Sequence, residues 1–195
     1  MDRKRWIHAA LVAVFALPAA ALGVRLIAGS LGANPIEELT HETGEWALRL
    51  MLASLAVTPA RQWLGWSRLA PYRRTLGLLA FGYACAHMLV YFAVDLFFDW
   101  RAILEAIVER PYVTAGFTAF ACLVPLAVTS TRRWMRRLGR RWNTLHRLVY
   151  VAAVAAAVHF LWLVKADLRE PLVYAAILAA LLAARPLYRL RRSRL

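Results

Sequence analysis

Long apolar segments alternate with short polar ones along the whole chain, as in a protein that crosses a membrane several times. A membrane-spanning helix needs about 20 mostly apolar residues. Pro111 and Pro171 suit the first turn of a helix, and Thr43 with Glu45 suits a helix start. The pattern therefore predicts an all-α membrane protein, built as a bundle of six transmembrane helices. These helices are expected at residues 6–28, 45–65, 74–95, 111–130, 143–164 and 171–188.

The composition agrees with a chain that lies mostly in lipid. Hydrophobic residues make up 62% of the 195 positions, against about 45–50% in soluble domains. Six spans of about 20 residues leave only short connecting segments, so we expect a single transmembrane domain over residues 1–195 and no soluble catalytic domain. Cys85 and Cys122 lie inside apolar segments and form no CxxC or CxxCH motif, which indicates buried thiols.

Positive charge is concentrated in short blocks between the apolar segments. The net charge is +14, from 25 Lys and Arg against 11 Asp and Glu. An N-terminus in the cytoplasm places 19 of the 25 basic residues on that side, and every acidic residue except Asp2 in or beside the opposite loops. The positive-inside rule therefore predicts that both termini are cytoplasmic. The basic blocks thus indicate orientation in a lipid membrane and no nucleic-acid partner. The first segment also resembles a signal peptide, but it continues to Ala28, which favours an uncleaved span.

Three of the five histidines belong to predicted spans, where an ionisable side chain requires a partner or a ligand. Arg74 marks the inner edge of the third span, and His87 lies 13 residues after it. His159 likewise lies 13 residues after His146, at the start of the fifth span. At about 1.5 Å per residue, both lie about 20 Å from the inner edge, at matching depth. Two imidazoles facing each other there could bind a haem iron axially, for electron transfer. Spacing alone leaves open a pair of hydrogen-bonded core histidines, or a proton pathway.

His146 and Arg49 have less defined roles. Thirteen residues turn an ideal helix through about 1300°, which sets His146 about 140° away from His159 in azimuth. A second metal site at His146 would need a bulge, a kink or an unusual partner ligand, and the residue could instead serve a flavin or the membrane interface. Arg49, in the outer part of the second span, could pair with a haem propionate or extend to the headgroups. His8 and His41 lie near span ends, which favours solvated, structural roles.

Four stretches of the sequence are distinctive in their order and in their positions within the predicted spans. They are HETG at 41–44, RPYVT at 110–114, TST at 129–131 and RRLGRRWNTLHRLVYVAAVAAAVHFLWLVK at 136–165. Together they resemble MsrQ, the haem-binding membrane subunit of the periplasmic methionine-sulfoxide reductase system, which belongs to the ferric-reductase-like transmembrane group. The resemblance covers nearly the whole chain. It implies b-type haem between the third and fifth spans, with His87, His146 and His159 as the family's metal-binding histidines. The family is also described as binding FMN.

The resemblance also implies a place in an electron path. Proteins of this family lie in the bacterial inner membrane and receive electrons from the quinone pool or a cytoplasmic flavin reductase. They pass them to a periplasmic molybdopterin-containing reductase that repairs oxidised proteins. The chain has no G-x-G-x-x-G motif, so we expect an electron-transfer subunit that does not reduce methionine sulfoxide by itself. From the residues alone, a small transporter or channel-like protein with histidines along a pathway stays open, although no internal repeat is visible in the sequence.

Overall fold

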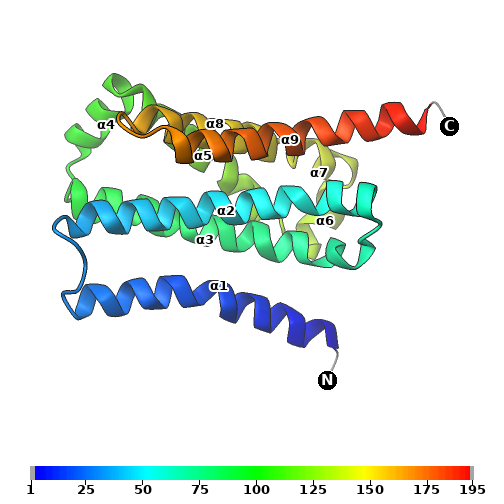
Figure 1. Cartoon of the computed structure of the whole chain (residues 1–195), viewed down its shortest axis with the longest axis horizontal. Coiled ribbons are helices and arrows are strands. Elements are labelled where there is room, and N and C mark those ends of the chain that lie inside the picture. The colour runs from blue at the N-terminus through cyan, green and yellow to red at the C-terminus, as the bar shows by residue number, and fades with distance from the viewer. Residues whose placement is uncertain (1–2, 194–195) are drawn as a thin grey trace.

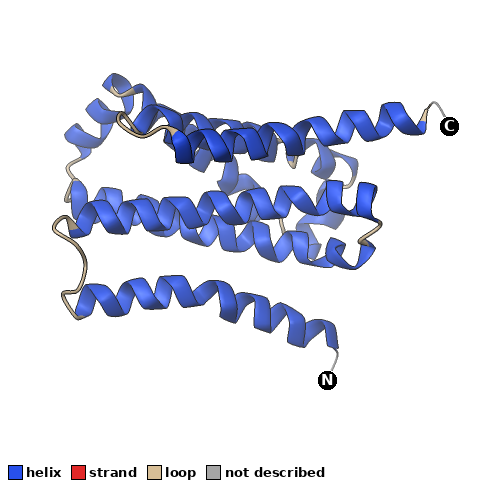
Figure 2. Ribbon diagram, viewed as in Figure 1, coloured by secondary structure: helices blue, strands red, loops and turns tan. Residues whose placement is uncertain are grey.

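Helices joined by short loops make up residues 3–193, the part that the computed structural model describes, and no strand occurs there (Figures 1 and 2). The predicted all-α class is confirmed. Asp2 and Arg194, which entered the charge assignment, lie outside the described residues. The elements in chain order are α1 (Arg3–Ile27), α2 (Pro35–Leu64), the 3₁₀-helix η1 (Ser67–Tyr72), α3 (Arg73–Leu89), the π-helix η2 (Val90–Asp95), α4 (Trp100–Glu109), α5 (Pro111–Val128), α6 (Arg132–Leu138), α7 (Arg140–Leu145), α8 (Leu148–Leu163) and α9 (Arg169–Arg192).

The long helices assemble as two antiparallel pairs with a further helix on either side. α2 packs along α3, α5 packs along α8, and contacts between α3 and α5 join the two pairs. α9 packs against both α2 and α8, whereas α1 lies at the edge of the molecule beside α3 (Figure 1). The centre of the bundle is therefore the four-helix unit of α2, α3, α5 and α8.

The chain is an all-helical, multi-pass membrane protein with five candidate spans among its described residues. α2, which the sequence pattern predicted as a further span, is not among the five. Charged residues, including Glu45, Arg49 and Arg61, lower its mean hydropathy. The five stretches that are long and apolar enough to cross a membrane are Arg5–Ile27, Ser67–Asp95, Pro111–Val128, Arg140–Leu163 and Arg169–Arg192.

α2 begins ten residues before the position that the sequence pattern gave it. Asn34 caps the helix, because its side chain accepts a hydrogen bond from the Glu37 backbone N–H, and a proline follows in the first turn. Thr43 and Glu45, expected at the helix start, lie inside the helix instead. Thr43 is buried and its hydroxyl donates to the Leu39 carbonyl. The predicted helix start was wrong because it was located from the apolar segment, and the first turns of α2 are mostly polar.

Two further departures from the sequence pattern lie in the connections. The short helix α4 was not predicted; Ile103 and Ala106 are buried on one of its faces, and it packs against α5. The fifth span is interrupted at His146 and Arg147, where α7 ends and α8 begins. Because the helix is interrupted there, the angle between the His146 and His159 side chains around the helix axis cannot be calculated from an ideal, continuous helix.

Small side chains let the central helices approach closely. Ala152 and Ala153 of α8 are fully buried, as are Leu50 and Leu55 of α2. Lipid tails are as apolar as the side chains, so close packing holds a transmembrane bundle together where the hydrophobic effect between helices is weak. Large apolar side chains are exposed on the outer faces, for example Leu17 of α1.

A tyrosine hydroxyl is inserted into the backbone of α1 beside Pro18. A proline inside a helix removes one N–H and disturbs the preceding turn. The Tyr83 hydroxyl of α3 donates to the Phe15 carbonyl at 2.7 Å and accepts from the Ala19 backbone N–H at 3.1 Å. It is therefore inserted into the backbone ladder of α1, which bends in mid-course (Figure 1).

Polar contacts also hold the ends of α1. His8 Nδ1 lies 2.8 Å from Thr75 Oγ1 on α3, which gives His8 a structural role. Arg25 forms an ion pair with Glu38 in the first turn of α2. The Gly32 backbone N–H donates to Glu38 at 2.7 Å and lowers the pKa of that carboxyl, which keeps the ion pair charged.

We expect Tyr83→Phe to weaken the attachment of α1. The change removes both hydrogen bonds that the Tyr83 hydroxyl makes to α1, and each such bond contributes about 0.5–1.5 kcal/mol. Thermal unfolding of the purified protein in detergent should therefore have a lower midpoint. Tyr188→Phe is the matched control, because Tyr188 packs edge-on against Trp63 and its hydroxyl makes no hydrogen bond to other described residues. Equal midpoints for the two variants would contradict the bridging role.

Candidate functional site

His87 and His159 meet inside the bundle, as their matched depth predicted. His87 lies near the end of α3 and His159 near the end of α8. Their ring centroids are 6.0 Å apart and their planes are inclined at 79°. The two residues come from different helix pairs, so the histidine pair lies where the two halves of the bundle meet.

Each of the two rings is held by a backbone carbonyl of a neighbouring helix. His87 Nδ1 lies 2.9 Å from the Thr40 carbonyl, and His159 Nδ1 lies 2.7 Å from the Tyr112 carbonyl. A carbonyl oxygen only accepts hydrogen bonds, so Nδ1 carries the proton in both neutral rings. The lone pair is therefore on Nε2, which leaves that atom as the one available to bind a metal.

Among the described residues, His87 and His159 form a pair of possible metal ligands without a third protein ligand beside them. No group of three or more His, Cys, Asp or Glu side chains that could hold a metal ion occurs within residues 3–193. A structural zinc site of four protein ligands therefore has no ligand set there. Two opposed imidazoles suit a metal whose other positions are filled by a macrocycle, as in haem.

A cavity of about 430 Å³ surrounds the two histidines. That volume lies within the range of cofactor and ligand sites, about 300–1,000 Å³. Most of the residues that line it are apolar or aromatic. Apolar wall residues include Met51, Met88, Phe92, Phe117, Phe120 and Phe160, and polar ones include Asn34, Glu37, His41, Glu45, Tyr91, Asp95 and Arg110.

Two polar side chains of this cavity had not been singled out from the sequence. Arg110 is the only arginine among the described residues that line it, and it caps the N-terminus of α5. The Tyr112 hydroxyl raises the pKa of the Arg110 guanidinium, which stays cationic. The Tyr91 hydroxyl is buried and has no hydrogen-bond partner among the described residues. The only sequence signal for Arg110 was its place in the RPYVT stretch.

The structure does not bring Arg49 into this cavity. Its Nε donates to the Tyr174 hydroxyl at 2.7 Å, and its Nη2 lies 2.5 Å from Glu45 and 3.7 Å from Glu170. The guanidinium also lies 5.2 Å from the centre of the Trp46 ring. Arg49 thus joins α2 to α9, and it reaches the cavity only through Glu45, which lines the wall.

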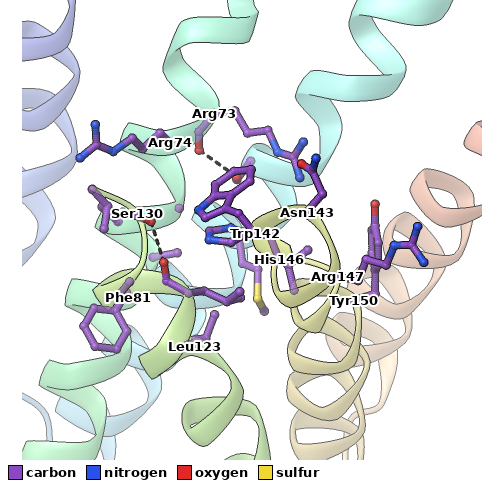
Figure 3. A pocket seen from close by; sticks show the side chains of 18 of the residues that line it. Arg73, Arg74, Phe81, Leu123, Ser130, Trp142, Asn143, His146, Arg147 and Tyr150 are labelled. Carbon is purple, nitrogen blue, oxygen red and sulfur yellow. Dashed lines mark hydrogen bonds between the residues drawn. The ribbon is translucent and has the colours of Figure 1, made fainter. Parts of the chain in front are cut away.

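A second cavity, of about 450 Å³, lies toward the opposite ends of the same helices. Trp142 and His146 stack there with ring centroids 3.8 Å apart. Figure 3 shows these two rings close together, with Arg74 on one side and Arg147 on the other. Arg73 also lines the cavity. Guanidinium groups beside an aromatic surface suit an anionic or aromatic ligand.

Thr129 fixes the orientation of His146. The Thr129 hydroxyl donates its single proton to the Pro125 carbonyl at 2.6 Å, so its oxygen accepts from His146 Nε2 at 3.1 Å. The Trp142 indole N–H donates to the Thr129 carbonyl at 2.9 Å. The proton of His146 is therefore on Nε2 and its lone pair on Nδ1, the reverse of the two histidines in the first cavity. The structural roles of Trp142 and Thr129 were not foreseen from the sequence.

Residues 43–157 match the family of the ferric reductase like transmembrane component. This match and the helical bundle define a protein of the ferric-reductase-like transmembrane class. The relatives found among curated proteins give a narrower assignment.

A protein of Rhodospirillum rubrum named protein-methionine-sulfoxide reductase heme-binding subunit MsrQ is 53% identical over 195 residues, covering 98% of this chain and 94% of that protein. A protein of the same name from Xanthomonas campestris pv. campestris is 52% identical over 181 residues, or 92% of this chain and 83% of the relative. One from Xanthomonas oryzae pv. oryzae is 49% identical over the same shares. No solved structure matches. The chain belongs to the MsrQ family, and the family inferred from the four sequence stretches is confirmed.

We expect the three histidines of the cavities to differ in which nitrogen carries the proton. Two-bond proton–nitrogen NMR spectra of metal-free protein with labelled histidine distinguish the two neutral tautomers. His87 and His159 should carry the proton on Nδ1, because carbonyls accept there, and His146 should carry it on Nε2. Thr129→Val is the control variant, since it removes the acceptor of His146 alone. Protonation of His146 on Nδ1 in the unaltered protein would refute the assignment.

Proposed function

We propose that this chain binds haem b and carries electrons across the bacterial inner membrane, to a periplasmic molybdopterin-containing methionine-sulfoxide reductase that repairs oxidised proteins. The relatives are named heme-binding subunits of protein-methionine-sulfoxide reductase, which supports both the cofactor and the partner. The observation that carries the proposal is the pair of His87 and His159, whose ring centroids are 6.0 Å apart and whose Nδ1 atoms are both hydrogen-bonded to backbone carbonyls.

The proposal includes α2 as a sixth span and both termini in the cytoplasm. α2 has 30 residues, or about 45 Å at about 1.5 Å per residue, which exceeds a hydrocarbon core of about 30 Å. Arg49 of this helix pairs with Glu45 and Glu170, and a charged side chain within a span requires partners of this kind. The basic segment 132–141 then lies on the cytoplasmic side, and the cavity with His87 lies nearer the periplasm.

The distance between the two histidines suits a haem iron held between them. A metal bound by both Nε2 atoms would place the ring centres about 6 Å apart, from two metal–nitrogen bonds of about 2 Å and about 1 Å from each Nε2 to its ring centre. The observed separation of the ring centroids is 6.0 Å. Bound there, a haem would supply one-electron transfer without an open position for substrate on the iron. His87 and His159 would hold the iron through Nε2, and the aromatic wall of the cavity would keep water away.

Arg110 and Tyr91 suit the propionate groups of that cofactor. Arg110 is cationic, and the Tyr91 hydroxyl is free to donate, so both can form hydrogen bonds to a carboxylate. Arg49, for which the sequence suggested this role, acts on the cofactor indirectly. It holds Glu45, whose side chain lines the cavity, in place.

The second cavity is the proposed electron-accepting side of the chain. Electrons would arrive there from the quinone pool or from a cytoplasmic flavin reductase, and FMN would occupy the same cavity. Arg73, Arg74 and Arg147 supply positive charge for a phosphate, and Trp142 supplies a surface for stacking. His146 presents Nδ1 as an acceptor or a metal ligand. The family's third histidine would then serve the donor side.

The chain is proposed to be an electron-transfer subunit, with methionine-sulfoxide reduction left to the periplasmic partner. The rigid hold on His87 and His159 also favours this function over a transporter or channel. A histidine that relays protons must release and rebind them, whereas both rings here donate Nδ1–H to fixed carbonyls.

We expect His87→Ala and His159→Ala each to remove the low-spin haem or to leave it five-coordinate and high-spin. His146→Ala should affect the same haem less, because His146 lies about 20 Å further along its segment at about 1.5 Å per residue. His8→Ala serves as the control, since that ring contacts Thr75 at the edge of the bundle. Haem content and absorption spectra of the purified proteins measure the outcome. A full low-spin spectrum in His87→Ala would refute the pairing.

We expect opposite labelling of two loops by an impermeant thiol reagent added to intact cells with a permeable outer membrane. In a background where Cys85 and Cys122 are replaced by alanine, Ala33→Cys should react because its loop is periplasmic. Arg136→Cys should react only after the inner membrane is opened. Both positions are exposed, so access differs only by the side of the membrane. Labelling of Arg136→Cys in intact cells would reverse the proposed topology.

A further inference from the structure

The two histidines of the first cavity are embedded in matching surroundings. A residue that supplies a carbonyl, a glycine one turn later and the histidine itself recur in both halves of the bundle. In the sequence, each of these residues in the first half lies 72 positions before its counterpart in the second half. Asp95 and Asp167 are also 72 positions apart. The two sets are Thr40, Gly44 and His87, and Tyr112, Gly116 and His159.

In each half, the glycine lies directly against the imidazole. A Cβ atom at Gly44 would lie 3.0 Å from His87 Nδ1 and 3.1 Å from its Cε1. A Cβ atom at Gly116 would lie 2.8 Å from His159 Nδ1 and 3.0 Å from its Cε1. Real Cβ atoms are rarely so close to a ring, so either side chain would push its histidine away from the helix.

The position of the glycines explains how the carbonyls are reached. Each glycine follows by four residues, one helical turn, the residue whose carbonyl accepts the Nδ1–H. Side chains of residues four apart lie on the same face of a helix. A side chain at the glycine would therefore occupy the helix surface on which the imidazole now lies, and would hinder its hydrogen bond to the carbonyl.

We propose that Gly44 and Gly116 are positioning residues for the two axial histidines, an inference that rests on the proposed haem function. Each glycine opens one helix surface, so that the imidazole lies against the backbone and donates Nδ1–H to the carbonyl one turn earlier. That bond fixes the tautomer and the ring orientation and strengthens the electron donation of Nε2. A stronger donor stabilises the oxidised iron and lowers its reduction potential.

A glycine destabilises a helix interior relative to alanine, so on helix propensity alone an alanine would be favoured at both positions. The chain also provides a matched control. Gly82 lies inside α3, and a Cβ atom there would meet nothing within 4 Å. An alanine at Gly82 therefore reports the general effect of replacing a helical glycine in this bundle.

The test compares Gly44→Ala, Gly116→Ala and Gly82→Ala with the unaltered haem-loaded protein. The measurements are haem content, the low-spin signal in electron paramagnetic resonance and the midpoint potential from a redox titration. Gly116→Ala should bind haem about 10-fold more weakly, as found when an outer partner of a metal ligand is lost. Its remaining haem should show a shifted low-spin signal and a higher midpoint potential. Gly44→Ala should change in the same direction by less, and Gly82→Ala should not change.

The outcomes separate this inference from the haem proposal. Absence of haem from the unaltered protein and from Gly82→Ala would refute the proposed function itself. Haem-loaded Gly44→Ala and Gly116→Ala with unaltered signals and potentials would overturn the positioning role alone. Equal losses in all three variants would assign the effect to helix packing and also overturn it. If Gly116→Ala is not recovered, Gly44→Ala decides, because its contact is the milder of the two.

Discussion

The hydrogen bond from an imidazole to a backbone carbonyl is the interaction on which the arrangement of this bundle depends. Inside a membrane no water replaces a missing partner, so a neutral histidine must find its acceptor within the protein. His87 and His159 find it in carbonyls of helical turns, and a carbonyl has a second lone pair available beyond the one used by its own helix. The bond forms only when the two helices are in register. It therefore links the packing of α2 on α3, and of α5 on α8, to the direction in which each ring points.

The two cavities are close neighbours with opposite chemistry. In one, two rings present Nε2 in an apolar, aromatic enclosure; in the other, a single ring presents Nδ1 among arginines. Met51 and Leu123 line both, and Phe81 of one cavity stacks on Phe120 of the other with ring centroids 5.9 Å apart. The two cavities therefore share part of their walls. Their closeness suits the proposed electron path, in which electrons pass from one cavity to the other.

The sequence predicted the features that depend on length and depth, and it failed where tertiary contacts decide. Apolar length located the ends of most helices, and counting residues from the basic edges matched the depth of His87 and His159. The start of α2 was missed because its first turns are rich in polar residues and do not extend the apolar segment. Arg110 and Tyr91 were missed because nothing in spacing shows which side chains of separate helices border one cavity. The repeat of carbonyl, glycine and histidine escaped notice because only three positions of each half share it.

The insertion of the Tyr83 hydroxyl beside Pro18 has a consequence for the order of assembly. A ribosome delivers α1 to the membrane first, before α3 exists, so the interrupted turn at Phe15 and Ala19 enters lipid without its partner. Unsatisfied backbone groups are costly there. α1 therefore takes its observed form only after α3 has arrived with its tyrosine. Because α1 lines neither cavity among the described residues, this late docking leaves the histidine sites undisturbed.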